Sequence, residues 1–223
     1  MSDYKQGLIL LVTKKNDWCQ KAIQLAKYIF GESNLIIKQG EQIGEKLPEL
    51  SDSFEIIISF LSPWIVPQKL LNKARIAINF HPGSREYPGM GCYNFAIYEK
   101  TKMFGATCHY MKSKVDSGDI IIERRFEVED HETIESLKYR TMIVMLALFH
   151  EVMGMIRKEI PLPKKNVSWS REPFTRAQLE DLCVINRTMT EEEVKRRVRA
   201  CHFPGYPDAK INIGGIDFLA LVK

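Results

Sequence analysis

Residues 78–91 read INFHPGSREYPGMG, and they place a polar pair, Asn79 and His81, at the end of an apolar run. The run RIAINF (75–80) has the composition of a buried strand, and the prolines and glycines after it are typical of a rigid loop. Side chains two positions apart in a strand lie on the same face of the sheet. We therefore expect Asn79 and His81 to lie side by side where a strand ends and a loop begins.

The segments before this stretch alternate between strand-like and helix-like patterns. Continuous apolar runs predict three more strands, at 7–12, 34–38 and 54–60. An apolar face over 18–29 predicts a helix capped by Asn16 or Asp17, and a second, short helix is expected to start at Ser62. The alternation is typical of a doubly wound α/β fold with a mostly parallel, Rossmann-like sheet, which binds ligands at the carboxyl ends of its strands.

The pattern changes after residue 91. A helix is expected over 92–100, two strands over 105–111 and 119–128, and a long amphipathic helix over 133–157 after the cap Asp130.

The last part of the chain is less regular. The linker PLPKKN (161–166) suggests a catalytic domain over 1–165 and a C-terminal extension over 166–223. A helix near 190–201 and a small β-hairpin that turns at Gly214-Gly215 are the expected elements of this extension.

Composition limits the function without deciding it. The chain has 223 residues and a net charge of +4, which favours an anionic partner but does not choose between phosphate, carboxylate and nucleic acid. Five scattered cysteines show no CxxC spacing and the histidines no HExxH spacing, so neither a disulfide framework nor a metal site is expected. No apolar stretch approaches the roughly 18 residues needed to span a membrane, and the N-terminal run is too short for a signal peptide. The expected location is the cytoplasm.

Three polar features accompany the predicted fold: the Asn79–His81 pair, the DSGD turn (116–119) and the LSP step (61–63), where the third strand ends. Each is ordinary by itself, because a lone histidine beside a turn is more often structural and DSGD is a common turn composition. The chain lacks the GxGxxG, P-loop and GxSxG motifs. Only the combination of the three features points to a function.

In this order and spacing the motifs resemble those of the formyltetrahydrofolate-dependent formyltransferase family. The strand ends in NxHP, a YxG loop begins at Tyr87, and GxTxH (105–109) and DxGxI (116–120) follow. The resemblance runs from the first strand to about residue 128 and is weaker beyond it. One departure concerns the loop after NxHP, where much of the family has SLLP and this chain has GSREYPG (83–89).

The resemblance implies a reaction in which a primary amine attacks the formyl carbon on N10 of the folate and a tetrahedral oxyanion forms. Asn79 would donate a hydrogen bond to this oxyanion. His81 would handle the proton or stabilise the oxyanion as an imidazolium. Asp116 would orient His81 or a relay water and raise the imidazole pKa.

The resemblance also places the donor N10-formyltetrahydrofolate. Its pterin would enter a slot between the end of the third strand and the loop before Asp116. The expected contacts are Ser59, Leu61, Val66, Lys112, Ser113, Lys114 and Val115. Plain core packing is the alternative for Leu61 and Val66.

Three residues are candidate contacts of the acceptor: Arg85, Tyr87 and Tyr93. Arg85 would meet a phosphate, or would be a solvated charge. Tyr87 would stack on a ring, or would pack within its loop.

The sequence of the C-terminal part indicates which acceptor is used. RACHFPGYPDAKINIGG (199–215) resembles the tail of sugar N-formyltransferases, and few residues follow Asn166 to form a tRNA-binding domain. The prediction is therefore formylation of a nucleotide-linked amino sugar for surface polysaccharide, with no nucleic-acid or membrane partner. The apolar hairpin would join two subunits of a homodimer. The alternatives are a glycinamide ribonucleotide or methionyl-tRNA formyltransferase, a formyltetrahydrofolate hydrolase, and a folate-binding relative without catalysis.

Overall fold

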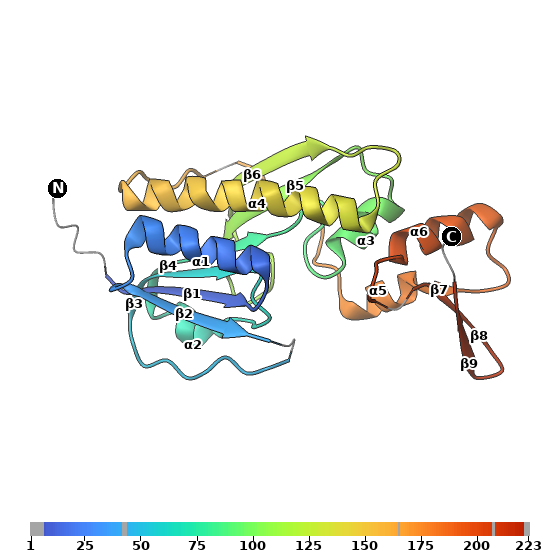
Figure 1. Cartoon of the computed structure of the whole chain (residues 1–223), viewed down its shortest axis with the longest axis horizontal. Coiled ribbons are helices and arrows are strands. Elements are labelled where there is room, and N and C mark those ends of the chain that lie inside the picture. Colours follow the sequence, from blue (N-terminus) through green and yellow to red (C-terminus); the bar gives the residue numbers. More distant parts are fainter. Residues whose placement is uncertain (1–6, 42–43, 165, 207, 221–223) are drawn as a thin grey trace.

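The computed structural model of the chain describes residues 7–41, 44–164, 166–206 and 208–220 (Figure 1). Its main sheet has six strands in the order β2-β1-β3-β4-β5-β6. The strands are β1 (Ile9–Lys14), β2 (Leu35–Gly40), β3 (Phe54–Phe60), β4 (Ala74–His81), β5 (Met103–Tyr110) and β6 (Ile120–Glu127). The first four pair in parallel, whereas β5 and β6 are antiparallel. The prediction of a mostly parallel α/β sheet is confirmed.

Helices cover both faces of this sheet, although unequally. The two long helices α1 (Asp17–Phe30) and α4 (Ile134–Arg157) lie side by side on one face, and the short α2 (Gln68–Leu71) lies on the other (Figure 1). The side chains of β1 alternate accordingly. Ile9 and Leu11 belong to the core under α1 and α4, whereas Leu10 and Val12 belong to the core that includes α2. A strand buried on both faces explains why this run is apolar at every position.

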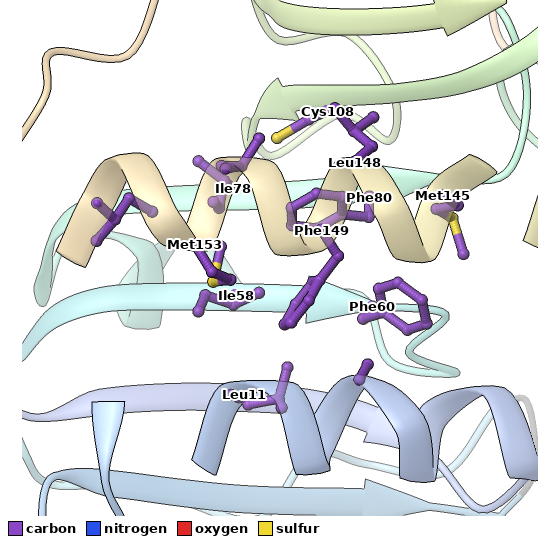
Figure 2. Close-up of a cluster of buried hydrophobic side chains, with 14 of the residues drawn as sticks. Leu11, Ile58, Phe60, Ile78, Phe80, Cys108, Met145, Leu148, Phe149 and Met153 are labelled. Carbon is purple, nitrogen blue, oxygen red and sulfur yellow. The ribbon is translucent and has the colours of Figure 1, made fainter. Parts of the chain in front are cut away.

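The larger core is built around α4. Phe149 projects from this helix onto the sheet, where its ring centroid lies 5.3 Å from Phe60 and 5.1 Å from Phe80 (Figure 2). By length and composition alone, α4 is apolar enough to cross a membrane. Its buried face packs on the sheet, as in a core helix.

The starts of the helices settle one prediction and correct two. The Asn16 side chain accepts a hydrogen bond of 2.8 Å from the first turn of α1, so Asn16 is the cap and Asp17 is the first helical residue. Helix α4 is capped by Thr133 in a reciprocal capping box with Ser136, and not by Asp130. The helix expected at Ser62 does not form there, because the chain turns at that point and α2 begins after Pro67.

Beyond the main sheet, α3 (Cys92–Tyr98) leads into β5, and the later chain forms a smaller unit. That unit contains α5 (Arg176–Leu182), β7 (Val184–Ile185), α6 (Glu191–Cys201), β8 (Lys210–Ile213) and β9 (Ile216–Leu219). Strands β8 and β9 form the predicted hairpin, and Gly214 and Gly215 supply the positive φ angles of 60° and 86° that the turn requires. The hairpin joins β7 in a three-stranded sheet, which was not predicted.

Candidate active site

Strand register brings three polar side chains into one row at the carboxyl end of the sheet. Ser59 on β3 pairs with Asn79 on β4, and Asn79 pairs with His109 on the antiparallel β5. His81, two residues beyond Asn79, closes β4. The turn after β5 then returns over this row and carries Asp116, whose backbone has a φ of 43°. Polar groups from three strands and one turn therefore meet at one point.

The Asp116 carboxylate is the centre of the group. Its Oδ2 lies 3.0 Å from His81 Nδ1 and accepts a 2.8 Å hydrogen bond from the Gly89 backbone N–H. Its Oδ1 lies 3.2 Å from His109 Nε2 and 3.3 Å from Asn79 Nδ2. Burial would raise the pKa of Asp116, but the two histidines hold it well below its usual range. The carboxylate is ionised and tightly held.

Both ring nitrogens of His81 face acceptor oxygens. Nδ1 faces Asp116, and Nε2 lies 2.8 Å from the backbone oxygen of Tyr87. Burial opposes the charged form, but the attraction of Asp116 and the two hydrogen bonds outweigh it and raise the pKa of His81. Both hydrogen bonds are satisfied only when the ring is an imidazolium with two N–H donors. In this arrangement His81 is a buried cation whose protons are already donated to the protein.

His109 completes the group, and the sequence analysis gave it a place in a motif but no role. Its Nδ1 donates to the backbone oxygen of Tyr110 at 2.8 Å, and its Nε2 lies 3.1 Å from Asn79 Nδ2. A neutral ring accepts the Asn79 amide hydrogen at Nε2, whereas a charged ring donates from Nε2 to Asp116. The available signal was a histidine within the apolar run GATCHYM (105–111). Its pairing opposite Asn79 is seen only in the structure.

A cavity of about 2680 Å³ opens beside Asn79, His81, His109 and Asp116. This volume exceeds the 300–1,000 Å³ typical of a site for one small molecule. Its walls include Ser59, Leu61, Val66, Lys112, Lys114, Val115 and Tyr93 among the predicted binding residues. It continues along the extension, where Leu179, Phe203 and Tyr206 line it. Ser113 is not among the lining residues.

The predicted donor slot contains groups suited to a heterocycle. Ser59 is buried beside Asn79, Val66 packs in the core with Trp64, and Leu61 has a left-handed φ of 53° where β3 ends. The indole Nε1 of Trp64 is buried in this wall without a hydrogen-bond partner among the described residues. Such an orphaned donor indicates a site for a polar ligand atom, which fits a pterin. Sequence reasoning missed Trp64.

Two of the three residues predicted to contact the acceptor do not line the cavity. Tyr87 is 3% exposed and packs against Phe104, and burial raises its pKa to about 12. Its predicted stacking on a ligand is wrong because the ring belongs to the core. Arg85 does not line the cavity, and its guanidinium lies 3.4 Å from Glu86. Tyr93 does line the cavity, and its buried hydroxyl has no partner in the described chain.

Fold and site together define the class of the protein. An α/β sheet that carries an amide, two imidazoles and a buried carboxylate at its carboxyl end, beside a large cavity, is consistent with the resemblance to formyltransferases. Residues 3–153 match the sequence profile of the formyl transferase family, and this match covers more than half of the chain. The chain therefore belongs to the formyl transferase family.

The chain is similar to several characterised members. It is 25% identical over 175 residues to the GDP-perosamine N-formyltransferase of Brucella melitensis, which covers 77% of this chain and 66% of the relative. It is 24% identical over 176 residues to the methionyl-tRNA formyltransferase of Ehrlichia ruminantium, which covers 77% of this chain and 54% of the relative. The chain thus spans less than two thirds of the length of each relative.

The fold is also similar to that of a solved N-formyltransferase from Helicobacter canadensis, in complex with folinic acid and dTDP-3-aminofucose. The TM-score is 0.75 at 18% identity, over 93% of this chain and 85% of that chain.

Proposed function

We propose that this protein transfers a formyl group from N10-formyltetrahydrofolate to the primary amine of a nucleotide-linked amino sugar. The observation that carries the proposal is the Asn79–His81–Asp116 group, held within hydrogen-bond distance beside a large cavity. The similarity to a GDP-perosamine N-formyltransferase, and to a fold that holds an amino sugar nucleotide, supports the choice of acceptor.

In the proposed reaction the amine nitrogen forms a bond to the formyl carbon, and the carbonyl oxygen becomes an oxyanion. The bond to N10 then breaks, and the proton lost by the amine goes to the leaving nitrogen. Asn79 carries two amide hydrogens, so it can keep one bond inside the group and offer the other to the oxyanion. The His81 cation stabilises the negative charge through its field.

The contacts of His81 favour this electrostatic role over that of a general base. A base needs a free lone pair, whereas both nitrogens of His81 carry protons that are donated to Asp116 and to the Tyr87 carbonyl. Transfer of the Nε2 proton to the substrate requires the bond to Tyr87 to open. Asp116 supports the reaction because it keeps the imidazole charged and correctly oriented.

A panel of acceptors tests the proposal. The protein is incubated with N10-formyltetrahydrofolate and, separately, with nucleotide-linked amino sugars, glycinamide ribonucleotide, methionyl-tRNA and no amine. We expect the mass gain of one formyl group on an amino sugar. Formylation of either other amine alone would assign the protein to that branch of the family, and formate release without an amine would identify a hydrolase. Folate binding without turnover would identify a non-catalytic relative.

The donor slot is tested separately by Leu61→Arg. Because Leu61 lines the cavity where β3 ends, a charged side chain there should block the pterin and weaken folate binding. Calorimetric titration with a non-reactive folate analogue measures the affinity, and circular dichroism checks that the variant is folded. Unchanged affinity in a folded variant would remove Leu61 from the site.

The three-stranded sheet of the extension is the proposed dimer contact. Ile213, Ile216, Phe218 and Leu219 are each between 42% and 63% exposed, and they are clustered on one small hairpin. Ile213 and Ile216 are cross-strand partners and Phe218 is two residues after Ile216, so these three share one face, whereas Leu219 lies on the other. Exposed apolar side chains that share a face mark an interaction surface, and a second copy of the chain is the proposed partner. A cytoplasmic location and a role in surface polysaccharide synthesis remain predictions.

A further inference from the structure

We propose that Trp169 is a positioning residue of the active site, which fixes both histidines and the turn that carries Asp116. It lies beyond the linker, in the part of the chain predicted to be a separate extension. The inference rests on the proposed function for its kinetic consequences, but the contacts that support it do not depend on the substrate.

One indole ring touches three parts of the site. The ring centroid of Trp169 lies 5.1 Å from that of His109 and 5.6 Å from that of His81, with interplanar angles of 86° and 79°. Edge-to-face contacts of this kind prefer defined ring orientations. The indole Nε1 donates a 2.8 Å hydrogen bond to the backbone oxygen of Gly118, two residues after Asp116. Trp169 is not among the residues that line the cavity, so it acts through the histidines and not on the substrate.

The backbone around Trp169 also holds the loop that follows β4. We call residues 169–174 the strap. The Ser170 N–H donates to the Arg85 oxygen at 3.2 Å, and the Phe174 N–H donates to the Pro88 oxygen at 2.9 Å. The Met90 N–H returns a 2.9 Å hydrogen bond to the Phe174 oxygen. The strap therefore pairs with the loop almost as an added strand.

This pairing matters because the same loop supplies two partners of the catalytic group. The Tyr87 oxygen accepts from His81, and the Gly89 N–H donates to Asp116. Gly89 permits this close approach, because a Cβ at this position would lie 2.4 Å from the Phe174 oxygen. A shift of the strap would move both partners at once.

Two side chains of the strap also contact α3 and the residue that follows it. The Phe174 ring stacks on Phe95 with centroids 3.7 Å apart and planes within 6°. The Arg171 guanidinium binds both carboxylate oxygens of Glu99, at 2.7 and 3.1 Å. These contacts hold the strap against α3 and Glu99, which limits the movement of Trp169 at the start of the strap.

The geometry predicts a specific kinetic effect. A residue that orients catalytic groups without touching substrate should change turnover more than substrate binding. Misplacement of reacting groups by about 1 Å costs on the order of 100-fold in rate. Loss of the indole should therefore lower kcat while KM for both substrates is nearly unchanged.

Three variants test this prediction in the full chain. Trp169→Leu removes the ring, and Trp169→Phe keeps an aromatic ring but loses the bond to Gly118. The control Tyr28→Leu removes an exposed aromatic ring on α1 that does not line the cavity. We expect kcat to fall on the order of 10- to 100-fold in Trp169→Leu, to be partly rescued in Trp169→Phe, and to be unchanged in Tyr28→Leu. Equal kcat in wild type and Trp169→Leu, or a loss confined to KM, would overturn the proposal.

A second measurement is independent of turnover and of the acceptor. The ring N–H protons of His81 are buried and hydrogen-bonded, so nitrogen-15 NMR of labelled histidine should show them as slowly exchanging signals in wild type. We expect these signals to be lost through exchange with water in Trp169→Leu and retained in Trp169→Phe and Tyr28→Leu. Identical His81 signals in wild type and Trp169→Leu would show that Trp169 does not hold the site, whatever the substrate is.

Discussion

At the scale of single residues, the site depends on one buried carboxylate. Asp116 is 6% exposed and contacts Asn79, His81 and His109. Burial of its charge would destabilise the protein if these three side chains were absent, and they would lose their orientation without the carboxylate. The spacing within one strand predicted that Asn79 and His81 are neighbours, because strand spacing is a local property. Asp116 joined this group only through the family resemblance. The motifs did not predict that both nitrogens of His81 are occupied, since the Tyr87 oxygen reaches His81 only through the fold of the loop.

Asp116→Asn should damage both stability and turnover. The amide carries no charge to balance the His81 imidazolium, so the pKa of His81 should fall and the free energy of unfolding should drop by about 3 kcal/mol or more. Turnover should fall on the order of 100-fold because the oxyanion loses a stabilising cation. Asp119→Asn, in the same turn but exposed beside Lys112, is the matched control and should cost less than about 1 kcal/mol.

The stability difference should also depend on pH. The pKa of His81 is raised above its ordinary value of 6.5, so its contribution is complete below that value and is lost as pH rises through the folded pKa. The pKa of Asp116 is depressed below 3.8, so its contribution is present above that value and is lost as the solution becomes more acidic. Urea unfolding of wild type and Asp116→Asn across pH should show the largest difference in unfolding free energy near pH 4–6.5. A difference that grows above neutral pH would contradict this assignment.

At the scale of elements, the turn after β5 places Asp116 through a very close backbone contact. A Cβ at Gly118 would lie 1.7 Å from the Tyr110 oxygen, so no other residue fits without movement of the turn. The DSGD composition predicted a turn, but the reason for this glycine is a long-range feature of β5 and β6.

Gly118→Ala should therefore push the turn away from β5. We expect a loss of at least about 2 kcal/mol in unfolding free energy and loss of formyl transfer. Gly154→Ala is the control, because Gly154 lies within α4 with open space around its Cα, and it should stabilise the protein by about 0.5–1 kcal/mol. Similar effects of both substitutions on urea midpoints would show that Gly118 is not sterically required.

Local pattern was sufficient for the elements that are buried and long. The apolar runs of β1, β3 and β4 and the face of α1 were predictable because burial on two faces or on one stripe leaves a direct mark on sequence. The elements α5 and β7 were not, because α5 is short and mostly polar and β7 has only two residues. Both depend on tertiary contacts, since β7 pairs with β8 and Leu182 of α5 shares a core cluster with Ala200 of α6. Tertiary contacts also explain why no helix starts at Ser62. Pro63 and Trp64 pack closely against Gly40, and the chain turns there to line the cavity.

At the scale of the whole molecule, the main sheet and the extension contribute to a single cavity. Residues of β3 and β4 line it, as do Leu179 and Phe203 of the extension. The cavity therefore extends across the boundary predicted between residues 165 and 166. Trp169 and the strap lie on the later side of this boundary and pack against the catalytic group.

The exposed hairpin gives a prediction about assembly. Replacement of Ile216 and Phe218 with lysine should convert a dimer to a monomer, because two desolvated charges would lie in the proposed contact. Sedimentation velocity over a range of concentrations measures the change. Tyr28→Lys, at an exposed aromatic residue on α1, is the control and should leave the assembly unchanged. A wild-type protein that stays monomeric at high concentration would exclude this interface.

The most direct measurement follows the formyl carbon itself. N10-formyltetrahydrofolate with an isotopically labelled formyl carbon is mixed with the protein and a nucleotide-linked amino sugar, and the label is followed by carbon NMR. We expect it to move from the folate to an amide on the sugar in wild type, and far more slowly in Asn79→Ala, which lacks the donor to the oxyanion. Label that appears only as free formate, or an equal transfer rate in Asn79→Ala, would contradict the proposed reaction and the site that performs it.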